Sequence, residues 1–534
     1  MWMLASLPKD CLLPLQLPCL ESLLLALLQL GLWLLALAAS AQLLRLGSWA
    51  LRTPLQSLPV LPDFRDDQQL ELAAYPPVTV QLPMRNERFV AGRAITAACA
   101  LHWPQQRLQV QVLDDSDDDT MAVVDQTTAA LRARGYTIEV VRRKTRDSFK
   151  AGHLDYALPT ATGDFIAVLD ADFVPPPDFL RYLLPALLGD SKLAFVQGRW
   201  SFLNESANLL TRVQALILHG LMLVEQAYLS ALGRPVQFNG TGGVWRKQAL
   251  LDAGGWVGKG EPGQAHAASV TEDLDLSYRI HLLGYRGRHL PQVAVPTELP
   301  ESMAAFRSQQ QRWVRGGAQV LRTLLGKLRE GRLTAAEKRT MLGHLLRHVR
   351  QPYLLLALLW LPLLALGLLK PAFAPPGGLL AAVLLLHLSL SVYYGAALKR
   401  LGRSPLGAVL LSPLVVGLSM GLSVSLTVAL WRGIWAGRAA AEFVRTPKTG
   451  DQPPAPSPDA LAALTPTPKA RPAGYRPVRD ALAQLELGLG VIYLVLCALL
   501  IKKGLILSAL GLGGLVGAGL LWVGLGSLRI GKSP

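Results

Sequence analysis

Long apolar runs on both sides of one polar segment limit what this chain can fold into. The first run, Leu23–Leu44, is about long enough to cross a bilayer. Five more runs follow the polar segment: Tyr353–Leu369, Leu379–Leu398, Leu406–Trp435, Leu485–Ile501 and Leu505–Leu525. Between them, Arg52–Arg350 has the composition of a soluble domain. We therefore expect a soluble domain joined to membrane spans, and not an ordinary soluble, fibrous or disordered protein.

The charge of the chain fits a membrane protein better than a nucleic-acid-binding one. Lysine and arginine number 53 and aspartate and glutamate 37, and charged residues make up 17% of the chain, below the roughly 25% of soluble domains. Most of the basic excess lies beside the apolar runs and within Arg307–Arg350. The positive-inside rule explains this placement without a nucleic acid partner, and Arg45 and Arg52 place the polar domain in the cytoplasm. The four cysteines form no C-x-x-C pair, so neither a disulfide scaffold nor a thiolate zinc site is expected.

The polar domain alternates short strand-like runs with helix-compatible segments. The strand-like runs are Val78–Leu82, Leu108–Leu113, Thr137–Val141, Phe165–Leu169 and Leu193–Val196. Helix-compatible segments include Arg88–Leu101 and Met121–Arg134. This alternation predicts an α/β domain with a doubly wound, mainly parallel sheet. Ligands of such sheets bind at the carboxyl ends of the strands.

The polar domain contains three acidic clusters, and two of them lie where a strand-like run ends. They are Asp114 and Asp115, then Asp170 and Asp172, then Glu272, Asp273 and Asp275. One such cluster alone reads as a solvated loop or a helix N-cap, but three in one α/β domain favour a site. The D-x-D pair of Asp170 and Asp172 suits a hard divalent cation, Mg²⁺ or Mn²⁺, which would also bind substrate phosphates.

A further candidate is the segment FRSQQQRWVRGG. Gln309, Arg312 and Trp313 fall on one face of a helix at spacings of three and four residues. An arginine beside a leaving diphosphate stabilises developing charge, and an aromatic face is a platform for a sugar ring. The alternative is an interfacial helix with a tryptophan anchor.

The chain closely resembles the membrane-embedded processive synthases of glycosyltransferase family 2, the cellulose synthase superfamily. The resemblance rests on the order of its motifs, which are D, D-x-D, T-E-D and Q-x-x-R-W, followed by membrane spans. LPMRNE (82–87) and FKAGHLDYAL (149–158) look like two further motifs of this family. VQGRWSFLN (196–204), FNGTGGVWRKQALLDAGGW (238–256) and EFVRTPKTG (442–450) look most like its cellulose-synthase-like A and C branch, which makes β-1,4-mannan, glucomannan or glucan. Two positions depart from the pattern of that branch. This chain has Gln311 where the branch usually has histidine, and Gly242 where alanine is common.

The resemblance implies a GT-A fold and an inverting, metal-dependent hexosyltransferase that uses GDP-mannose or UDP-glucose with Mg²⁺ or Mn²⁺. The implied catalytic residues are Asp273 as general base, Glu272 and Arg312. The implied nucleotide-sugar-binding residues are Asn86, Glu87, Asp114, Asp115, Lys150, Asp170, Arg445 and Lys448. Asp170 and Asp172 would hold the metal. Gln309, Trp313, Asn239 and Gly240 would bind the glycan acceptor.

The same resemblance predicts that the product leaves through the chain's own spans, with membrane lipids and possible accessory export subunits as partners. The expected segments are a membrane anchor (1–51), a cytoplasmic GT-A domain (52–300), interfacial helices (301–352), membrane segments (353–435), a cytoplasmic loop with RTPKTG (436–484) and C-terminal membrane segments (485–534). The composition predicts a bacterial inner membrane. Two alternatives are a non-processive enzyme that adds a sugar to a lipid, and a catalytically inactive scaffold or transporter.

Overall fold

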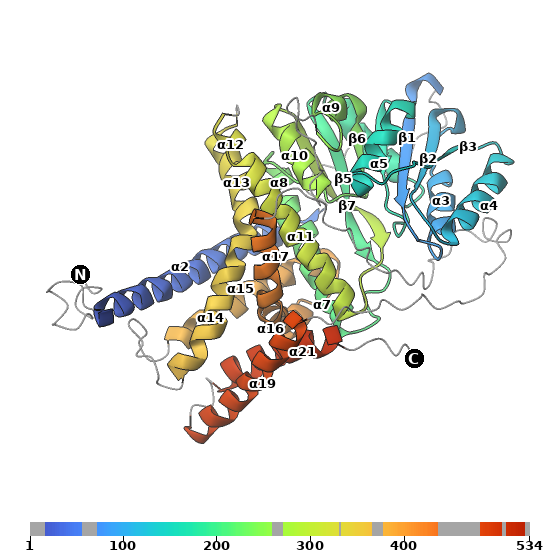
Figure 1. Ribbon diagram of the computed structural model, residues 1–534. Helices are drawn as coiled ribbons and strands as arrows, with labels where there is room; N and C mark the ends of the chain where they lie inside the picture. The colour runs from blue at the N-terminus through green and yellow to red at the C-terminus, as the bar shows by residue number, and fades with distance from the viewer. Residues whose placement is uncertain are drawn as a thin grey trace. The chain divides into compact units, whose positions relative to one another are not determined.

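The computed structural model describes residues 17–55, 72–258, 271–330, 333–365, 378–435, 481–504 and 509–528. The chain divides into two compact units, each built from segments that are distant in sequence. One unit comprises Leu55–His348 and Ala429–Arg476, and the other comprises Met1–Pro54, Val349–Val428 and Pro477–Pro534. We call them the catalytic unit and the membrane unit, and Figure 1 labels many of their elements.

The catalytic unit is built on a seven-stranded sheet in the order β3-β2-β1-β4-β6-β5-β7. Its strands are β1 (Val78–Met84), β2 (Leu108–Asp114), β3 (Thr137–Val141), β4 (Phe165–Val168), β5 (Leu193–Phe202), β6 (Gly243–Arg246) and β7 (Arg286–Thr297). β1 pairs parallel with β2 and β4, β2 pairs parallel with β3, and β5 pairs parallel with β7. β6 is antiparallel to both of its neighbours. The expected mainly parallel sheet is confirmed.

Helices cover both faces of this sheet, because its strands carry apolar side chains on each side. One core joins Val80 and Val110 of the sheet to α3 (Ala91–Cys99), α4 (Thr120–Arg132) and α6 (Phe179–Gly189). The other core joins Ile166 and Trp245 to α5 (Phe149–Ala157), α9 (Lys247–Asp252) and α10 (Glu272–Leu282). The further helices of this unit are α7 (Leu209–Gly220), the π-helix Leu221–Gln226, α8 (Ala227–Ala231), α11 (Met303–Leu324), α12 (Lys327–Glu330) and α13 (Ala335–Leu345).

The five strands that the sequence predicts are all present, but β6 and β7 were not predicted. β6 has only four residues and begins inside the glycine-rich stretch NGTGG. β7 carries arginine, glycine, proline and histidine among its twelve residues, so it lacks a continuous apolar run. Both strands owe their conformation to pairing with distant parts of the chain, which local sequence does not reveal.

In the membrane unit, the described parts of all six apolar runs lie in helices. These are α2 (Leu17–Arg52), α14 (Arg350–Ala365), α15 (Gly378–Arg400), α16 (Leu406–Gly421), the first residues of α17 (Ser423–Trp435), α19 (Ala481–Lys502), the π-helix Ala509–Val516 and α21 (Gly517–Leu528). Within the described residues, Trp33–Arg52 and Ala481–Lys502 are each long and apolar enough to cross a membrane. α16 and α17 pass the same test only as a pair, and the pair is bent by 53°.

The long run Leu406–Trp435 is therefore a broken helix. The break falls between Gly421 and Ser423, and Pro413 lies inside α16 and not at the bend. A Cβ atom on Gly421 would lie 2.5 Å from the carbonyl oxygen of Gly519, so α16 and α21 pack closely beside this break. Small residues permit such close approach of helices in membranes.

Candidate active site

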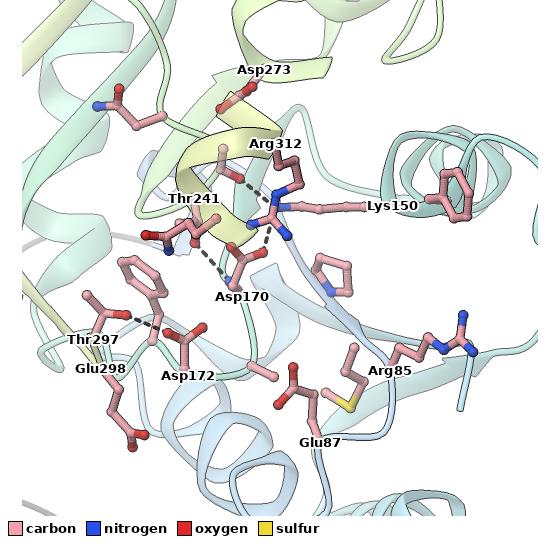
Figure 2. Close-up of a pocket in the computed structure, with 18 of the residues that line it drawn as sticks. Arg85, Glu87, Lys150, Asp170, Asp172, Thr241, Asp273, Thr297, Glu298 and Arg312 are labelled. Atoms are coloured by element: carbon pink, nitrogen blue, oxygen red, sulfur yellow. Dashed lines mark hydrogen bonds and ion pairs between the residues drawn. The ribbon is translucent and has the colours of Figure 1, made fainter. Parts of the chain in front are cut away.

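A cavity of about 250 Å³ opens at the carboxyl ends of β1 and β4 in the catalytic unit. Residues that follow these strands line it, together with side chains from α5, α10 and α11 (Figure 2). The sequence placed the ligand site at the carboxyl ends of the strands, and the cavity lies there. Of the residues predicted for the site, those that line it are Glu87, Asp115, Lys150, Asp170, Asp172, Asn239, Gly240, Glu272, Asp273, Gln309, Arg312 and Trp313.

Asp170 and Lys150 form the centre of this cavity. Asp170 follows Leu169 at the end of β4, and its backbone N–H donates to Oγ1 of Thr241 at 2.8 Å. The Nζ atom of Lys150 lies 2.5 Å from Oδ1 of Asp170 and also donates to the carbonyl oxygen of Gly240 at 2.9 Å. Burial alone would lower the pKa of Lys150, but the carboxylates of Asp170 and Glu272 outweigh it and raise the pKa. Lys150 therefore stays cationic inside the cavity.

The second carboxylate of the D-A-D segment belongs to Asp172, which is buried. Its Oδ2 accepts a hydrogen bond from Oγ1 of Thr297 at 2.7 Å. No cluster of three or more His, Cys, Asp or Glu side chains suited to a metal occurs among the residues that the structure describes. Mg²⁺ commonly takes one or two protein carboxylates and completes its shell with substrate phosphates and water. The Asp170 and Asp172 pair has the donor chemistry for that kind of site.

Glu272 and Asp273 are the first residues of α10 and line the cavity. The buried residues Leu276 and Ile280 of this helix pack in the core and fix its position. Burial raises the pKa of Asp273 to about 7, and the neighbouring Glu272 carboxylate adds to the effect. Burial also raises the pKa of Glu272, against the opposing charge of Lys150. A carboxyl group that titrates near neutral pH can accept a proton efficiently from a substrate hydroxyl.

The glycine-rich loop before β6 comes close to the same carboxyl group. Gly240 has a positive φ of 86°, and a Cβ atom there would lie 3.1 Å from Oδ2 of Asp273. A side chain at this position would be strained and would crowd Asp273. Gly240 thus leaves space beside the reactive carboxyl group.

Arg312 and Trp313 reach the cavity from α11. This helix begins after Ser302, whose Oγ accepts a hydrogen bond from the backbone N–H of Ala305. Burial lowers the pKa of the Arg312 guanidinium, and the charges of Glu272, Asp170 and Asp273 oppose that shift. Trp313 packs against the apolar cluster of Ala215, Leu218 and Leu299. The cavity therefore has a charged part around Asp170 and an apolar edge at Trp313.

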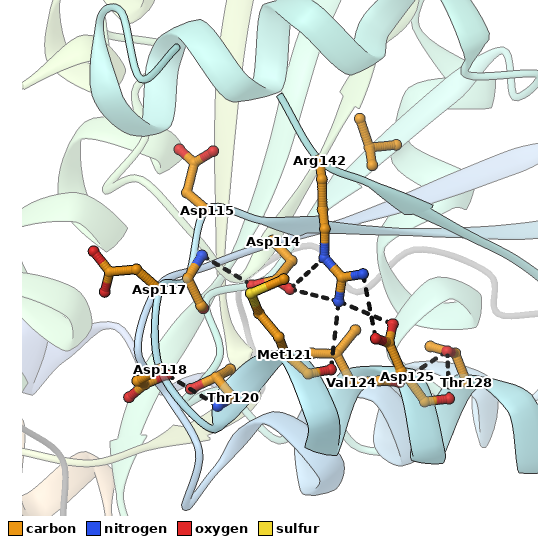
Figure 3. A network of polar contacts seen from close by, with 12 residues as sticks. Asp114, Asp115, Asp117, Asp118, Thr120, Met121, Val124, Asp125, Thr128 and Arg142 are labelled. Carbon is orange, nitrogen blue, oxygen red and sulfur yellow. Dashed lines mark hydrogen bonds and ion pairs between the residues drawn. The ribbon is translucent and has the colours of Figure 1, made fainter. Parts of the chain in front are cut away.

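The structure separates the two neighbouring aspartates at the end of β2. Asp115 lines the cavity, and Arg143 holds its carboxylate at 2.7 Å. Burial would raise the pKa of Asp115, but hydrogen bonds from His153 and Arg143 outweigh it and lower the pKa. Asp114 is not among the lining residues, and its Oδ2 accepts from Nε of Arg142 at 2.9 Å (Figure 3).

Of the three other predicted residues, the structure describes only Asn86, and it is not in the cavity lining. Asn86 adopts a positive φ of 53° and donates from Nδ2 to Oδ1 of Asp117 at 2.7 Å, outside the cavity lining. Arg445 and Lys448 lie outside the described residues. Their roles, with that of Asp114, stay predictions from the resemblance.

Sequence reasoning missed several residues that support the site. Thr241 and Thr297 hold Asp170 and Asp172, and Glu298 lines the cavity while it pairs with Arg93 at 2.7 Å. Thr241 lies inside the NGTGG segment, so its position was available from the sequence. Thr297 ends the unpredicted strand β7 and Glu298 follows it, and no local pattern marked either residue.

Comparison with known proteins gives two kinds of match. The family described as "Glycosyl transferase family group 2" matches residues 165–430. The Arabidopsis thaliana protein "Probable glucomannan 4-beta-mannosyltransferase 10" is 38% identical over 279 residues, 51% of this chain and 49% of that protein. "Glucomannan 4-beta-mannosyltransferase 1" of Oryza sativa subsp. japonica is 40% identical over 269 residues, 50% of each chain. The chain thus spans about half the length of the curated relatives it matches.

Among solved structures, a mannosyltransferase from Pyrobaculum calidifontis in complex with GDP-Man and Mn²⁺ aligns with a TM-score of 0.46 and 19% identity, over 76% of this chain and 99% of that one. The sequence matches carry the assignment. They agree with the order of the motifs and with the strand-end cavity described above. On these matches, residues 165–430 of the chain belong to the family 2 glycosyltransferases.

Proposed function

We propose that this chain is an inverting hexosyltransferase that extends a β-linked polysaccharide of the mannan, glucomannan or glucan type. The observation that carries the proposal is the convergence of Lys150, Asp170, Asp273 and Arg312 in one cavity. The 38% and 40% identities to glucomannan mannosyltransferases support a nucleotide diphosphate hexose, GDP-mannose or UDP-glucose, as donor.

The donor would lie along the carboxyl ends of β1 and β4. Glu87 and Asp115 would contact the nucleoside, and Asp170 and Asp172 would hold Mg²⁺ or Mn²⁺. When bound, either ion neutralises charge on the diphosphate. Lys150 keeps Asp170 in place through its contacts with that carboxylate and with Gly240.

The acceptor would enter from the apolar edge of the cavity. Trp313 offers a flat face to a sugar ring, while Gln309 and Asn239 offer amide groups, and all three line the cavity. Gly240 leaves room beside Asp273 for the attacking hydroxyl. This arrangement would place the end of a glycan chain against the general base.

Transfer then needs one displacement. Asp273 removes the proton from the acceptor hydroxyl as that oxygen forms a bond to the anomeric carbon. The bond between the anomeric carbon and the diphosphate oxygen breaks, and its electron pair leaves with the diphosphate. The Arg312 cation would stabilise the charge that develops there. A single carboxylate acting as base gives inversion, because a retaining route needs a nucleophile as well.

The membrane unit suggests where the product goes. Among the residues that the structure describes, two helices, or three with the bent pair, are long and apolar enough to cross a membrane. We propose that the catalytic unit faces the cytoplasm, and that the polymer leaves through the membrane helices with or without accessory subunits. The bacterial inner membrane stays a prediction, since the two relatives described above are plant proteins.

Nucleotide release by the purified full chain tests the proposal. We expect release with one of GDP-mannose and UDP-glucose, dependent on Mg²⁺ or Mn²⁺ and lost in Asp273→Asn. Asp125→Asn is the matched control, because it removes an exposed carboxylate on α4 that is not part of the cavity lining. Release that is unchanged in Asp273→Asn would contradict the role of the base. A product that extracts entirely into organic solvent would favour the lipid acceptor.

A further inference from the structure

Near the end of α17, the helix crosses α11 at very short range. A Cβ atom on Gly433 would lie 2.5 Å from the carbonyl oxygen of Arg315 and 2.7 Å from Cβ of Ala318. Arg322 of α11 adds a hydrogen bond from Nη1 to the carbonyl oxygen of Ile434 at 3.2 Å. Because glycine lets the helices touch, the neighbouring Arg432 is held beside Arg315.

The crossing brings two positive charges together. Burial lowers the pKa of Arg315, and the charge of Arg432 lowers it further. The Nε atom of Arg315 is buried and has no hydrogen-bond partner within the described parts of the chain. No carboxylate among the described residues forms an ion pair with Arg315 or Arg432. A buried donor without a partner, next to a like charge, is costly unless an anion binds.

Two tryptophans lie on the same end of α17. Trp431 and Trp435 are one turn apart, their rings stack with centroids 6.2 Å apart, and 49% and 74% of their surfaces are exposed. Exposed tryptophans at the end of an apolar helix are typical of the boundary between lipid tails and headgroups. Here they end the bent pair that has the length and hydropathy of a span.

We propose that Arg315 and Arg432 bind the phosphate of an anionic phospholipid headgroup, with Arg322 beside them and Trp431 and Trp435 at the acyl boundary. Guanidinium groups match phosphate oxygens with paired hydrogen bonds. The exposed tryptophans select a lipid over a free phosphate, because a free phosphate has no apolar part to contact them. The site lies outside the catalytic cavity, so lipid binding there can be measured whether or not the proposed transfer reaction takes place.

Binding of a lipid at this site would affect the active site through α11. Arg315 lies three residues after Arg312 on α11, and Gly433 of α17 packs against α11 at Arg315. An anion on Arg315 would fix the crossing and thereby the helix that carries Arg312. The lipid thus has a route to influence the enzyme without entering the cavity.

Binding of labelled phosphatidylglycerol to the full chain in mixed micelles tests the site without any activity assay. We expect the wild type to prefer phosphatidylglycerol over phosphatidylcholine. Arg315→Gln and Arg432→Gln should each weaken that preference about fivefold, the effect of one basic residue at an anionic surface. Arg339→Gln, which removes an exposed arginine on α13, should leave it unchanged.

Two controls keep the result decisive. Arg432 is exposed, so Arg432→Gln should fold even where Arg315→Gln does not, and thermal unfolding of each variant checks this. Excess glycerol phosphate or inorganic phosphate should not displace the lipid. Unchanged lipid preference in folded Arg432→Gln would overturn the proposal, and displacement by soluble phosphate would overturn the choice of a lipid as ligand.

Discussion

Nζ of Lys150 lies 2.5 Å from Oδ1 of Asp170, and the same ammonium group donates to the carbonyl oxygen of Gly240 at 2.9 Å. One lysine therefore ties the α5 segment, the end of β4 and the glycine-rich loop before β6 to one point. The contact also explains how the Asp170 carboxylate is held in the cavity. Charge-assisted hydrogen bonds of this kind are the stronger class of hydrogen bond in proteins.

Replacement of Lys150 should therefore weaken donor binding. In Lys150→Met, Asp170 loses its cation and the loop loses its tether, and hydrogen bonds to charged groups contribute about 1.5–3 kcal/mol. We expect the affinity for the nucleotide sugar to fall by about tenfold to a hundredfold, measured by titration calorimetry. Lys144→Met, which removes a lysine that does not line the cavity, serves as the control. Equal affinity in Lys150→Met and wild type would contradict this role.

The raised pKa of Asp273 predicts the pH dependence of transfer. A general base must be ionised, so kcat/KM should rise with pH and level off above an inflection near 7, where the Asp273 pKa lies. Activity should fall as pH drops below that value. Glu272→Gln removes the adjacent charge that adds to the shift, so the inflection should move to lower pH. A profile that is flat between pH 5 and 8 would refute the assignment of Asp273 as base.

Thr297 is predicted to act through the carboxylate it holds. In Thr297→Val, Asp172 loses the 2.7 Å hydrogen bond that fixes its orientation. Loss of a residue that orients a metal ligand commonly weakens metal binding by about 10–100-fold. Electron paramagnetic resonance of Mn²⁺ with nucleoside diphosphate present measures this directly. Thr297→Ser keeps the hydroxyl and should bind Mn²⁺ as the wild type does, whereas equal weakening in both variants would point to a packing effect.

A buried acid holds the broken helix of the membrane unit. Oε1 of Glu486 accepts a hydrogen bond from the N–H of Ser425 at 3.2 Å, just after the break between α16 and α17. Glu486→Ala should leave that buried amide without its acceptor, which costs about 1–3 kcal/mol. We expect a lower thermal unfolding temperature in detergent, with a smaller drop for Glu486→Gln because its amide oxygen still accepts. An unfolding temperature equal to that of the wild type in Glu486→Ala would show that the bond contributes nothing.

The sequence revealed the parts of the site whose signals are local. Apolar runs marked β1 and β4, and the prediction from the D-x-D motif placed Asp170 and Asp172 at the edge of the sheet where the cavity lies. The Q-x-x-R-W spacing placed Gln309, Arg312 and Trp313 together, and all three line the cavity. These predictions needed only the periods of strands and helices.

The parts that were missed depend on contacts between distant segments. The sequence of β7 lacks a continuous apolar run, so Thr297 at its end and Glu298 just after it could not be recognised before the strand was placed. Asp114 is different, because a signal existed. Successive side chains of a strand point to opposite faces, so only one of Asp114 and Asp115 could reach the cavity from the end of β2. In the structure, Asp115 lines the cavity, whereas the carboxylate of Asp114 accepts a hydrogen bond from Arg142.

The linkage and length of the product test the central claim most directly. The purified full chain should be given each donor with Mg²⁺ or Mn²⁺ in nanodiscs, and the product should be sized before and after digestion with a β-1,4-specific hydrolase. Our account predicts a polymer from one donor that this hydrolase degrades, and no such polymer from Asp273→Asn. An α-linked product, or a single transferred sugar as the only product, would contradict it.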